Sequence, residues 1–236
     1  MCGSAGEAIA DIILGVASPS GRLAASWYTN ALISRRDIAN MDLRSDGGIT
    51  YQYTTADDII YPFGFGLSYS SFAFETITKA ATTSTTHMQA QHAAGAKATA
   101  AAAHYDTTTV GFTPDLPSYL INVTNTGTLA SSVSVLGFVT ATAAVRGAEM
   151  DAPLKELFDF ERLVDVAPGE SRMVQLSIPP AVLSLTDAQG VESIRSGGYE
   201  IEIGVEGAAE GSVARASLEV AGDDTVLFSL PAPTSP

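Results

Sequence analysis

Cysteine and basic residues are scarce in this sequence, and each scarcity excludes a class of function. The single cysteine, Cys2, allows no internal disulfide and no metal site built from paired cysteines. Lysine and arginine together number 12 against 26 aspartates and glutamates, so the net charge is −14. Nucleic acid is therefore not an expected partner, because binding to phosphates needs clustered basic residues. The same acidity argues against binding to anionic membrane surfaces.

Long apolar runs are also missing, and no stretch has the length and apolarity that a membrane-spanning helix needs. Residues 1–21 resemble a signal peptide only superficially, because they lack a basic start and because Glu7 and Asp11 interrupt the apolar segment. We interpret this segment as folded protein and allow that it was cut from something longer. The sequence leaves the cellular compartment open, including secretion of a parent enzyme.

Histidine is absent from the parts of the sequence that we expect to be ordered. His87, His92 and His104 all lie in residues 80–109, a low-complexity segment dominated by Ala and Thr. Ordered sequence therefore offers no histidine for a Ser-His-Asp or Cys-His arrangement, and Cys2 has no base to activate it. A zinc site in 80–109 would need a fourth ligand and a fixed geometry, which this composition does not offer. We assign no catalytic, cofactor-binding or metal-binding residue and expect no cofactor.

Carboxylates are plentiful in residues 29–60, which predict a long loop with a short strand near Thr50–Tyr53. Two carboxylates about 5–10 Å apart can act as acid and base on a glycosidic bond. Nothing in the sequence indicates that two of them converge, so we interpret them as solvated side chains. A new site built by this acidic loop stays as a weaker alternative. The aspartates concerned are Asp37, Asp42, Asp46, Asp57 and Asp58.

The residues before this loop predict a fragment of α/β structure. Residues 4–14 carry apolar side chains at helical spacing, with Ser4 as the N-cap, Glu7 three residues later, and Gly15 just past the end. A turn follows, and residues 23–28 predict a short strand. One helix, one turn and one strand are too little to bury a core. We therefore expect their apolar faces to be exposed without partners.

From residue 72 onward the pattern is typical of β structure. Residues 72–79 predict a strand, residues 80–109 predict a disordered or fraying insertion, and β patterning resumes at Leu116. The clearest strand, residues 199–206, alternates apolar side chains with acidic or small ones. Six or seven short strands separated by turns over about a hundred residues predict an immunoglobulin-like sandwich. Within this region Asn122-Val123-Thr124 fits the N-glycosylation sequon, which we interpret as a chance match inside a strand.

Residues 61–69 read YPFGFGLSY and raise two interpretations. The aromatic rings could form a platform for a sugar, or they could pack at a domain junction. Glycine permits backbone conformations and close approaches that other residues forbid. Because the stretch joins the α/β fragment to the first strand of the sandwich, we favour packing.

Taken together, these segments resemble the C-terminal part of glycoside hydrolase family 3. AIADIILGVASPSGRLAASWY (8–28) is similar to the family's helix, Pro-Ser-Gly-Arg-Leu turn and strand. MDLR (41–44) and GITYQYTT (48–55) resemble segments of its β-xylosidase-like branch, and residues 61–72 nearly match its Tyr-Pro-Phe-Gly-Tyr-Gly-Leu-Ser-Tyr signature. The segments that resemble its fibronectin type III-like domain are LINVTNTG, PLKELFDFERL and VAPGESRMVQLSI.

The sequence also departs from the family pattern. Ile49 and Gln52 replace two arginines of the Gly-Arg-Thr-Tyr-Arg-Tyr segment, and Ala24 replaces a proline. In the family the nucleophilic aspartate lies in an N-terminal barrel domain, and the acid/base glutamate lies upstream of the segment resembled here. Neither region is found in this sequence, so no catalytic residue is carried over. We expect the chain alone not to hydrolyse glycosides, because the retaining mechanism needs both carboxylates.

Two functions from different classes follow from the resemblance. The first is the C-terminal part of a family 3 exo-β-glycosidase, xylosidase-like, with a β-glucosidase parent left open. Its oligo- or polysaccharide substrate belongs to a complete parent enzyme, with the barrel domain as the missing partner. The alternative is a stand-alone, non-catalytic fibronectin type III-like module that binds carbohydrate or protein.

The expected fold is mainly β: a fibronectin type III-like sandwich preceded by a remnant of an α/β sandwich domain. Residues 1–60 are the remnant with its long loop, and residues 61–71 are the junction. Residues 72–222 are the sandwich with the 80–109 insertion, and residues 223–236 are a tail.

Overall fold

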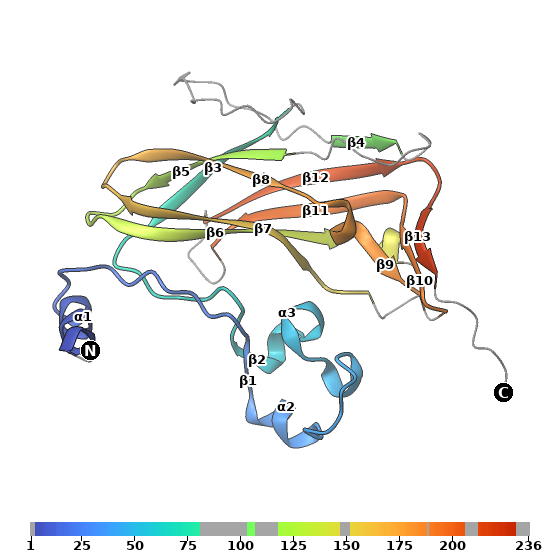
Figure 1. Cartoon of the computed structure of the whole chain (residues 1–236), viewed down its shortest axis with the longest axis horizontal. Coiled ribbons are helices and arrows are strands. Elements are labelled where there is room, and N and C mark those ends of the chain that lie inside the picture. Colours follow the sequence, from blue (N-terminus) through green and yellow to red (C-terminus); the bar gives the residue numbers. More distant parts are fainter. Residues whose placement is uncertain are drawn as a thin grey trace.

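The computed structural model describes residues 3–80, 103–106, 118–146, 152–187, 189–205 and 212–229. It has two regions, which we call the N-terminal part (residues 3–71) and the sandwich (from Phe72). Figure 1 shows the sandwich as two layers of long strands, with the N-terminal part along one side of it. The mainly β fold expected from the sequence is confirmed.

The sandwich pairs a five-stranded sheet with a three-stranded sheet. The larger sheet has the order β4-β12-β11-β6-β7, and the smaller one has the order β3-β5-β8. All neighbours are antiparallel except β12 and β4, which are parallel. The strands are β3 (Phe72–Ala80), β4 (Ala103–Asp106), β5 (Ser118–Asn125), β6 (Ser131–Ala141), β7 (Glu156–Val166), β8 (Ser171–Ser177), β11 (Gly197–Gly204) and β12 (Val213–Ala221).

The core lies between these two sheets, and side-chain alternation creates it. In β5 the buried residues Tyr119, Ile121 and Val123 alternate with half-buried ones, because successive side chains of a strand point to opposite faces. In β11 Ile201 and Ile203 are fully buried while Glu200 is exposed, as the period-two pattern predicts. All members of the core cluster lie between Phe72 and Val220, so the core belongs to the sandwich.

Strand β4 corrects part of the expectation for the insertion. Residues 103–106 pair in parallel with β12, Leu218 opposite Ala103 and Ala221 opposite Asp106. The physical reason is that β12 would otherwise leave an edge of unpaired backbone groups, and four residues of the insertion satisfy them. Residues 81–102 and 107–117, which include His87 and His92, lie outside the described residues.

A smaller sheet closes one end of the sandwich, with the order β13-β10-β9. Its strands are β9 (Ser184–Thr186), β10 (Val191–Ile194) and β13 (Thr225–Ser229), and short helices α4 (Ala143–Arg146) and η3 (Pro180–Leu183) lie nearby. Strand β13 falls in the stretch that the sequence analysis assigned to a tail. It pairs antiparallel with β10, from Thr225 opposite Ile194 to Ser229 opposite Val191.

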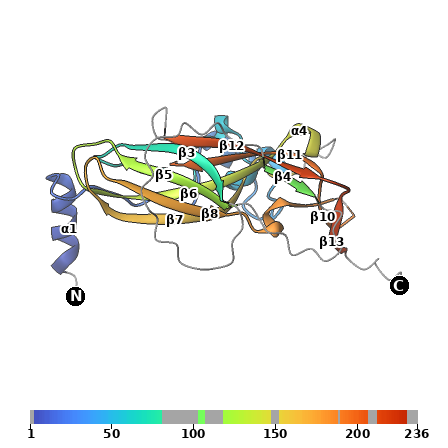
Figure 2. The ribbon, with the colours of Figure 1, turned by 90° about the horizontal axis from the view of Figure 1, so that it is seen from above.

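The N-terminal part begins with α1 (Gly3–Ile13), which stands beyond one end of the sandwich (Figure 2). The helix starts one residue before Ser4, so Ser4 lies inside it and the expected N-cap position is wrong. Its end is as predicted: Gly15 has φ +73°, the Gly15 N–H donates to Ile12 O, and the Val16 N–H donates to Asp11 O. This is a Schellman ending, which glycine suits because its left-handed backbone carries no penalty.

Two short strands and four short helical turns complete the N-terminal part. They are β1 (Trp27–Tyr28), α2 (Asn30–Arg35), η1 (Ser45–Gly47), α3 (Thr50–Tyr53), η2 (Ala56–Asp58) and β2 (Ile59–Tyr61). Only two residues of the strand expected at 23–28 are in β1, which pairs with β2. The strand expected near Thr50–Tyr53 is wrong, because these residues form the helical turn α3. Tertiary contacts of its side chains override the β preference of Thr and Tyr.

Candidate functional site at the junction of the two parts

Hydrogen bonds of serine hydroxyls connect the N-terminal part to one end of the sandwich. The Ser131 hydroxyl at the start of β6 donates to Ser18 Oγ at 2.9 Å, and Ser68 Oγ lies 3.2 Å from Ser18 Oγ. The Ser18 hydroxyl also accepts from the Tyr69 N–H at 3.1 Å. Nearby, Arg162 of β7 donates to Ser20 Oγ at 2.9 Å. The turn at 18–23 is therefore held by the sandwich itself.

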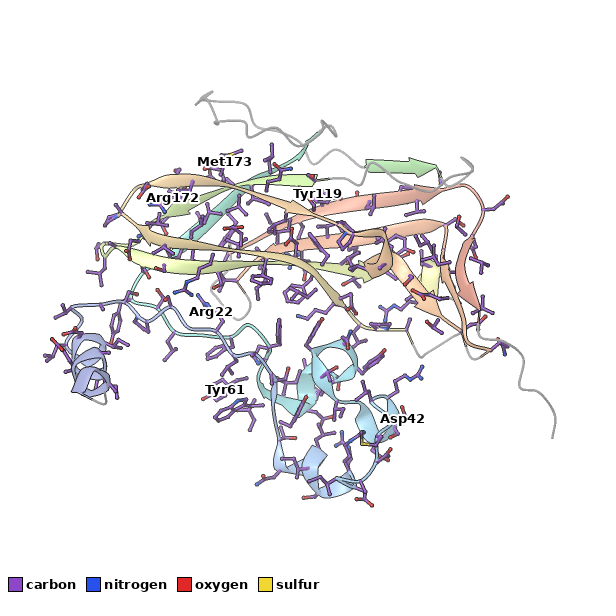
Figure 3. The ribbon with its side chains drawn as sticks, viewed as in Figure 1. Arg22, Asp42, Tyr61, Tyr119, Arg172 and Met173 are labelled. Atoms are coloured by element: carbon purple, nitrogen blue, oxygen red, sulfur yellow. The ribbon has the colours of Figure 1, made fainter. Side chains whose placement is uncertain are left out.

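Two glycines in residues 61–69 allow this segment to lie close against the turn at 18–23. Gly64 has φ +81°, a backbone conformation that favours glycine. Gly66 lies against the backbone of the turn, where an added Cβ would come within 2.4 Å of Gly21 O. Arg22, labelled in Figure 3, donates to Gly66 O at 3.1 Å. The two glycines therefore permit the pairing of residues 61–66 with residues 21–27.

Aromatic rings form the middle of the junction. Phe63 stacks on Tyr51 with ring centroids 4.7 Å apart, and its edge faces Phe138 of β6 at 6.2 Å. Lys155 Nζ lies 4.6 Å from the centre of the Phe138 ring, in the range of a cation–π contact. The expectation that this aromatic–glycine stretch packs at the junction agrees with these contacts of Phe63.

Other rings of the same stretch face away from the sandwich. Tyr61 lies 4.9 Å from Phe65 and 6.1 Å from Trp27, measured between ring centroids. Trp27 is 58% exposed and Tyr61 41% exposed, and Figure 3 shows Tyr61 beside the N-terminal part on the side away from the sheets. The aromatic stretch thus has one ring in the junction and a separate, exposed cluster.

Hydrogen bonds tie α3 to the start of β7. The Gln52 side-chain amide donates to Glu156 Oε2 at 2.5 Å, and Gln52 O accepts from the Leu154 N–H at 2.6 Å. The Tyr51 hydroxyl accepts from the Leu157 N–H at 3.2 Å. Gln52 stands where the resembled Gly-Arg-Thr-Tyr-Arg-Tyr segment has its second arginine, so an uncharged amide meets Glu156 here.

Burial shifts the pKa values of two groups at this contact, the Glu156 carboxyl and the Tyr51 hydroxyl. It raises the pKa of the Glu156 carboxyl above its usual range, and the hydrogen bond from Gln52 acts in the opposite direction. Burial also raises the pKa of the Tyr51 hydroxyl, against the hydrogen bond from Leu157 and together with the nearby Glu156 charge. An arginine in place of Gln52 would stabilise the charged carboxylate, whereas the amide leaves it easier to protonate.

A cavity of about 680 Å³ lies beside this contact. Its walls come from the loop at 41–44, from α3, from the end of β6 and from residues 181–186. The polar side chains in the lining are Asp42, Arg44, Gln52, Tyr53, Glu156, Ser184, Thr186 and Tyr199. Asp42 accepts from the Arg44 N–H at 3.0 Å and Glu156 accepts from Gln52, so both lining carboxylates already have partners. This arrangement suits packing or binding of a neutral polar ligand.

Local contacts also hold most of the aspartates that the sequence analysis singled out. Asp37 accepts from the Ala39 N–H at 2.9 Å, and Asp46 accepts from the Asn40 amide at 3.1 Å. Asp58 forms an ion pair with Arg35. These contacts, like that of Asp42, are of the kind that shapes a turn-rich loop. Asp57 lies in η2 and is exposed.

The remaining candidates do not meet at this junction. Cys2 lies outside the described residues, and His104 lies in β4, opposite Glu219 of β12. Within the described ranges, no three His, Cys, Asp or Glu residues are grouped as a metal site would require. No helix among the same residues is long and apolar enough to cross a membrane.

Sequence reasoning missed the Gln52–Glu156 contact, whose residues are 104 positions apart. Local patterns carry no signal for such a pairing. The departure at position 52 from the arginine of the resembled segment marked this position as unusual, but it did not identify Glu156 as the partner.

Comparison with known proteins finds two family models that match separate parts of the chain. Residues 1–69 match the glycosyl hydrolase family 3 C-terminal domain, and residues 139–206 match the fibronectin type III-like domain. A protein named probable exo-1,4-beta-xylosidase bxlB from Aspergillus clavatus is 32% identical over 231 residues, which are 97% of this chain and 27% of that protein. The exo-1,4-beta-xylosidase xlnD of Aspergillus oryzae is 29% identical over 85% of this chain and 24% of its own length.

Solved structures show the same correspondence. The GH3 exo-β-xylosidase XlnD, in complex with a xylobiose aziridine activity-based probe, superposes with a TM-score of 0.76 at 27% identity. That match covers 98% of this chain and 28% of that one. A GH3 β-glucosidase of Bifidobacterium adolescentis shares the fold, with a TM-score of 0.63 at 23% identity over 98% of this chain and 30% of its own. The chain spans about a quarter of the curated relatives it matches. It belongs to glycoside hydrolase family 3 and corresponds to the C-terminal region of the family's β-xylosidase-like branch.

Proposed function

We propose that this chain serves as the C-terminal part of an exo-β-glycosidase that hydrolyses O-glycosyl bonds of xylan-derived oligosaccharides. The observation that carries the proposal is the match of 97% of the chain to proteins named exo-1,4-beta-xylosidases. The preference for xylosides over glucosides rests on the same relatives. Within that enzyme the chain would complete the α/β domain and hold the sandwich beside it.

The apolar surface of the N-terminal part supports this structural role. Ile13 is 73% exposed, Leu14 76% and Trp27 58%. Many large apolar side chains exposed in one part of a chain mark a surface that another part covers. We propose that the covering part is the remainder of the α/β domain with the barrel domain, and that both catalytic carboxylates belong to that remainder. The contacts at the junction would then fix the sandwich against the completed domain.

We also propose the division of the chain expected from its sequence. Residues 1–60 would belong to the α/β domain, residues 61–71 would be the junction, and residues 72–222 would be the sandwich. The hydrogen bonds of Ser131 to Ser18 and of Gln52 to Glu156 cross that junction and support it as a firm connection. Residues 223–236 would form the tail, from which 225–229 return to pair with β10.

Turnover of chromogenic glycosides tests the proposal. Purified 1–236 should release no nitrophenol from nitrophenyl β-xyloside or β-glucoside, and a parent enzyme with the upstream region should release it, faster from the xyloside. Clear turnover by the purified chain would refute the assignment of the catalytic carboxylates. Sequencing the genomic DNA or transcript upstream is the matched test, since a stop codon just before Met1 would favour a stand-alone module.

One observation favours that second candidate, a module that binds carbohydrate: the cavity beside Glu156, whose lining includes hydroxyl groups and the Gln52 amide. Titration calorimetry of the chain with xylotriose, beside a Tyr53→Ala variant, tests it. Binding that the variant loses would support a binding module. Absence of heat in the wild-type chain would dismiss it and would leave the first proposal untouched.

A further inference from the structure

Asn122 occupies an unusual place for its residue type. It lies in the middle of β5, the central strand of the three-stranded sheet, opposite Glu75 of β3 and Met173 of β8. Its neighbours in sequence, Ile121 and Val123, are fully buried, so the Asn122 side chain points to the outer face of the sheet. Glu75 is exposed and Met173 is 48% exposed, and Met173 lies on the outside of the sandwich in Figure 3.

Asn125, three positions further along, shows what a structural asparagine does in this fold. It is fully buried, and its side-chain oxygen accepts from the Ser70 hydroxyl and the Gly127 N–H, both at 2.9 Å. Its amide group donates to Leu129 O at 2.9 Å and to Val166 O at 2.8 Å. Every hydrogen-bonding direction of Asn125 is used.

Asn122 has no comparable role. Within the part of the chain that the structure describes, its side chain makes no hydrogen bond. Asparagine is depleted from strands, because its side chain competes for backbone hydrogen bonds and packs poorly on a pleated surface. A disfavoured residue at the centre of a sheet, without a hydrogen bond in return, points away from a structural role and toward a use of its half-buried amide on the outer face.

The residues after Asn122 supply that use. Val123 is not proline, and Thr124 carries the hydroxyl that completes the sequon. The outward position of Asn122 is an observation that the interpretation as a chance match did not weigh. We propose that Asn122 is an acceptor of N-linked oligosaccharide when the chain passes through a eukaryotic secretory pathway. The proposal is independent of the catalytic function proposed above.

The chemistry is a group transfer from a lipid-linked donor. Asn122 Nδ2 forms a bond to C1 of the oligosaccharide, the bond from C1 to the lipid pyrophosphate oxygen breaks, and the amide loses one proton as the lipid pyrophosphate leaves. Because β5 is paired with β3 and β8 on both sides, the transfer must precede formation of the sheet. Afterwards the glycan would stand on an outer face formed mainly by uncharged side chains. These are Leu120, Thr124, Ser171, Met173 and Gln175.

The test is expression of the full chain behind a secretory signal in a yeast host, with the gel mobility read in whole-cell lysate and in medium. We expect a slower band that returns to the unmodified position after treatment with a peptide N-glycosidase, and conversion of Asn122 to Asp in the released peptide. Reading the lysate as well as the medium keeps the result valid if the chain is retained in the cell.

Three variants separate the sequon from other causes. Asn122→Gln and Thr124→Val should abolish the shift, and Thr124→Ser should keep it because serine completes the sequon. Thr124→Val retains a β-branched side chain, so the strand should tolerate it. An unshifted wild-type chain, or a shift that persists in Asn122→Gln, would overturn the proposal.

Discussion

The N-terminal part and the sandwich have similar shares of apolar residues but use them in opposite ways. Among the described residues before Phe72, Leu32 is the one large hydrophobic side chain that is buried, whereas the sandwich encloses a continuous core. Among the residues that the structure describes, fourteen exposed large hydrophobic residues lie in the N-terminal part and six in the sandwich. We therefore expect the sandwich to fold around its own core, and we expect the exposed apolar side chains of the N-terminal part to be covered by another structure.

The largest expected effect is a difference in stability between truncating one core side chain of the sandwich and truncating one side chain of the N-terminal part. Ile201→Ala should lower the free energy of unfolding by about 2–5 kcal/mol, because it leaves a cavity in the fully buried core. Ile13→Ala in α1 should change it by no more than about 0.5 kcal/mol, since that side chain is already 73% exposed. Urea unfolding followed by circular dichroism measures both. Equal losses would show that the N-terminal part has a core of its own.

Within the sandwich, replacing a buried polar residue should cost far more stability than replacing an outward-facing one in the same strand. Asn125→Ala removes four hydrogen bonds from a fully buried position and should cost about 3 kcal/mol, because its partners are left unsatisfied. Asn122→Ala, in the same strand, is the matched control and should cost almost nothing in unglycosylated protein. If Asn122→Ala destabilised the chain as much, the outward position of that residue would be wrong.

The junction should show a smaller effect that depends on pH. Gln52→Ala should cost about 1 kcal/mol through the lost hydrogen bond to Glu156. Burial holds the folded-state pKa of Glu156 above its unfolded value, which is near 4.5. The stabilisation from this group is therefore fully present below the unfolded pKa and is lost as the pH rises through the folded pKa.

Glu156→Gln should remove that loss, and Gln52→Arg should reduce it by favouring the charged carboxylate. Thermal unfolding across pH 4 to 8, compared as differences from the wild-type chain, measures both variants. Glu202→Gln, whose carboxylate pairs with exposed Arg215, is the control. A pH profile of Glu156→Gln parallel to that of the wild-type chain would contradict the part assigned to Glu156.

Substitutions of exposed apolar side chains should change stability least. They should change solubility instead. Replacing Ile13 and Leu14 together by Glu should leave the unfolding midpoint unchanged and should reduce self-association, because it removes two exposed apolar side chains at the end of α1. Light scattering at increasing concentration reads this, with Met173→Glu on the sandwich as the control. Unchanged association in the double variant would mean that the apolar side chains at the end of α1 do not drive self-association.

Sequence patterns predicted the structural features that depend on residues close together in the chain. The ending of α1 at Gly15 and the alternation in β11 follow from local spacing, and the motif order predicted the family. Thr and Tyr favour strands, which predicts one at Thr50–Tyr53, but these residues form the helical turn α3, from which Tyr51 stacks on Phe63. The pairing of β4 with β12 and the contact of Gln52 with Glu156 join distant residues, so no local pattern contains them.

Hydrogen exchange of the whole chain, read by mass spectrometry peptide by peptide, tests most directly whether one region is self-sufficient and the other is not. Amides of β5, β6 and β11 should exchange only through global unfolding, whereas amides of α1 and of the 29–60 loop should exchange orders of magnitude faster through local opening. Protection of α1 equal to that of β11 would contradict the account, because it would show that the N-terminal part is stable without the remainder of its domain.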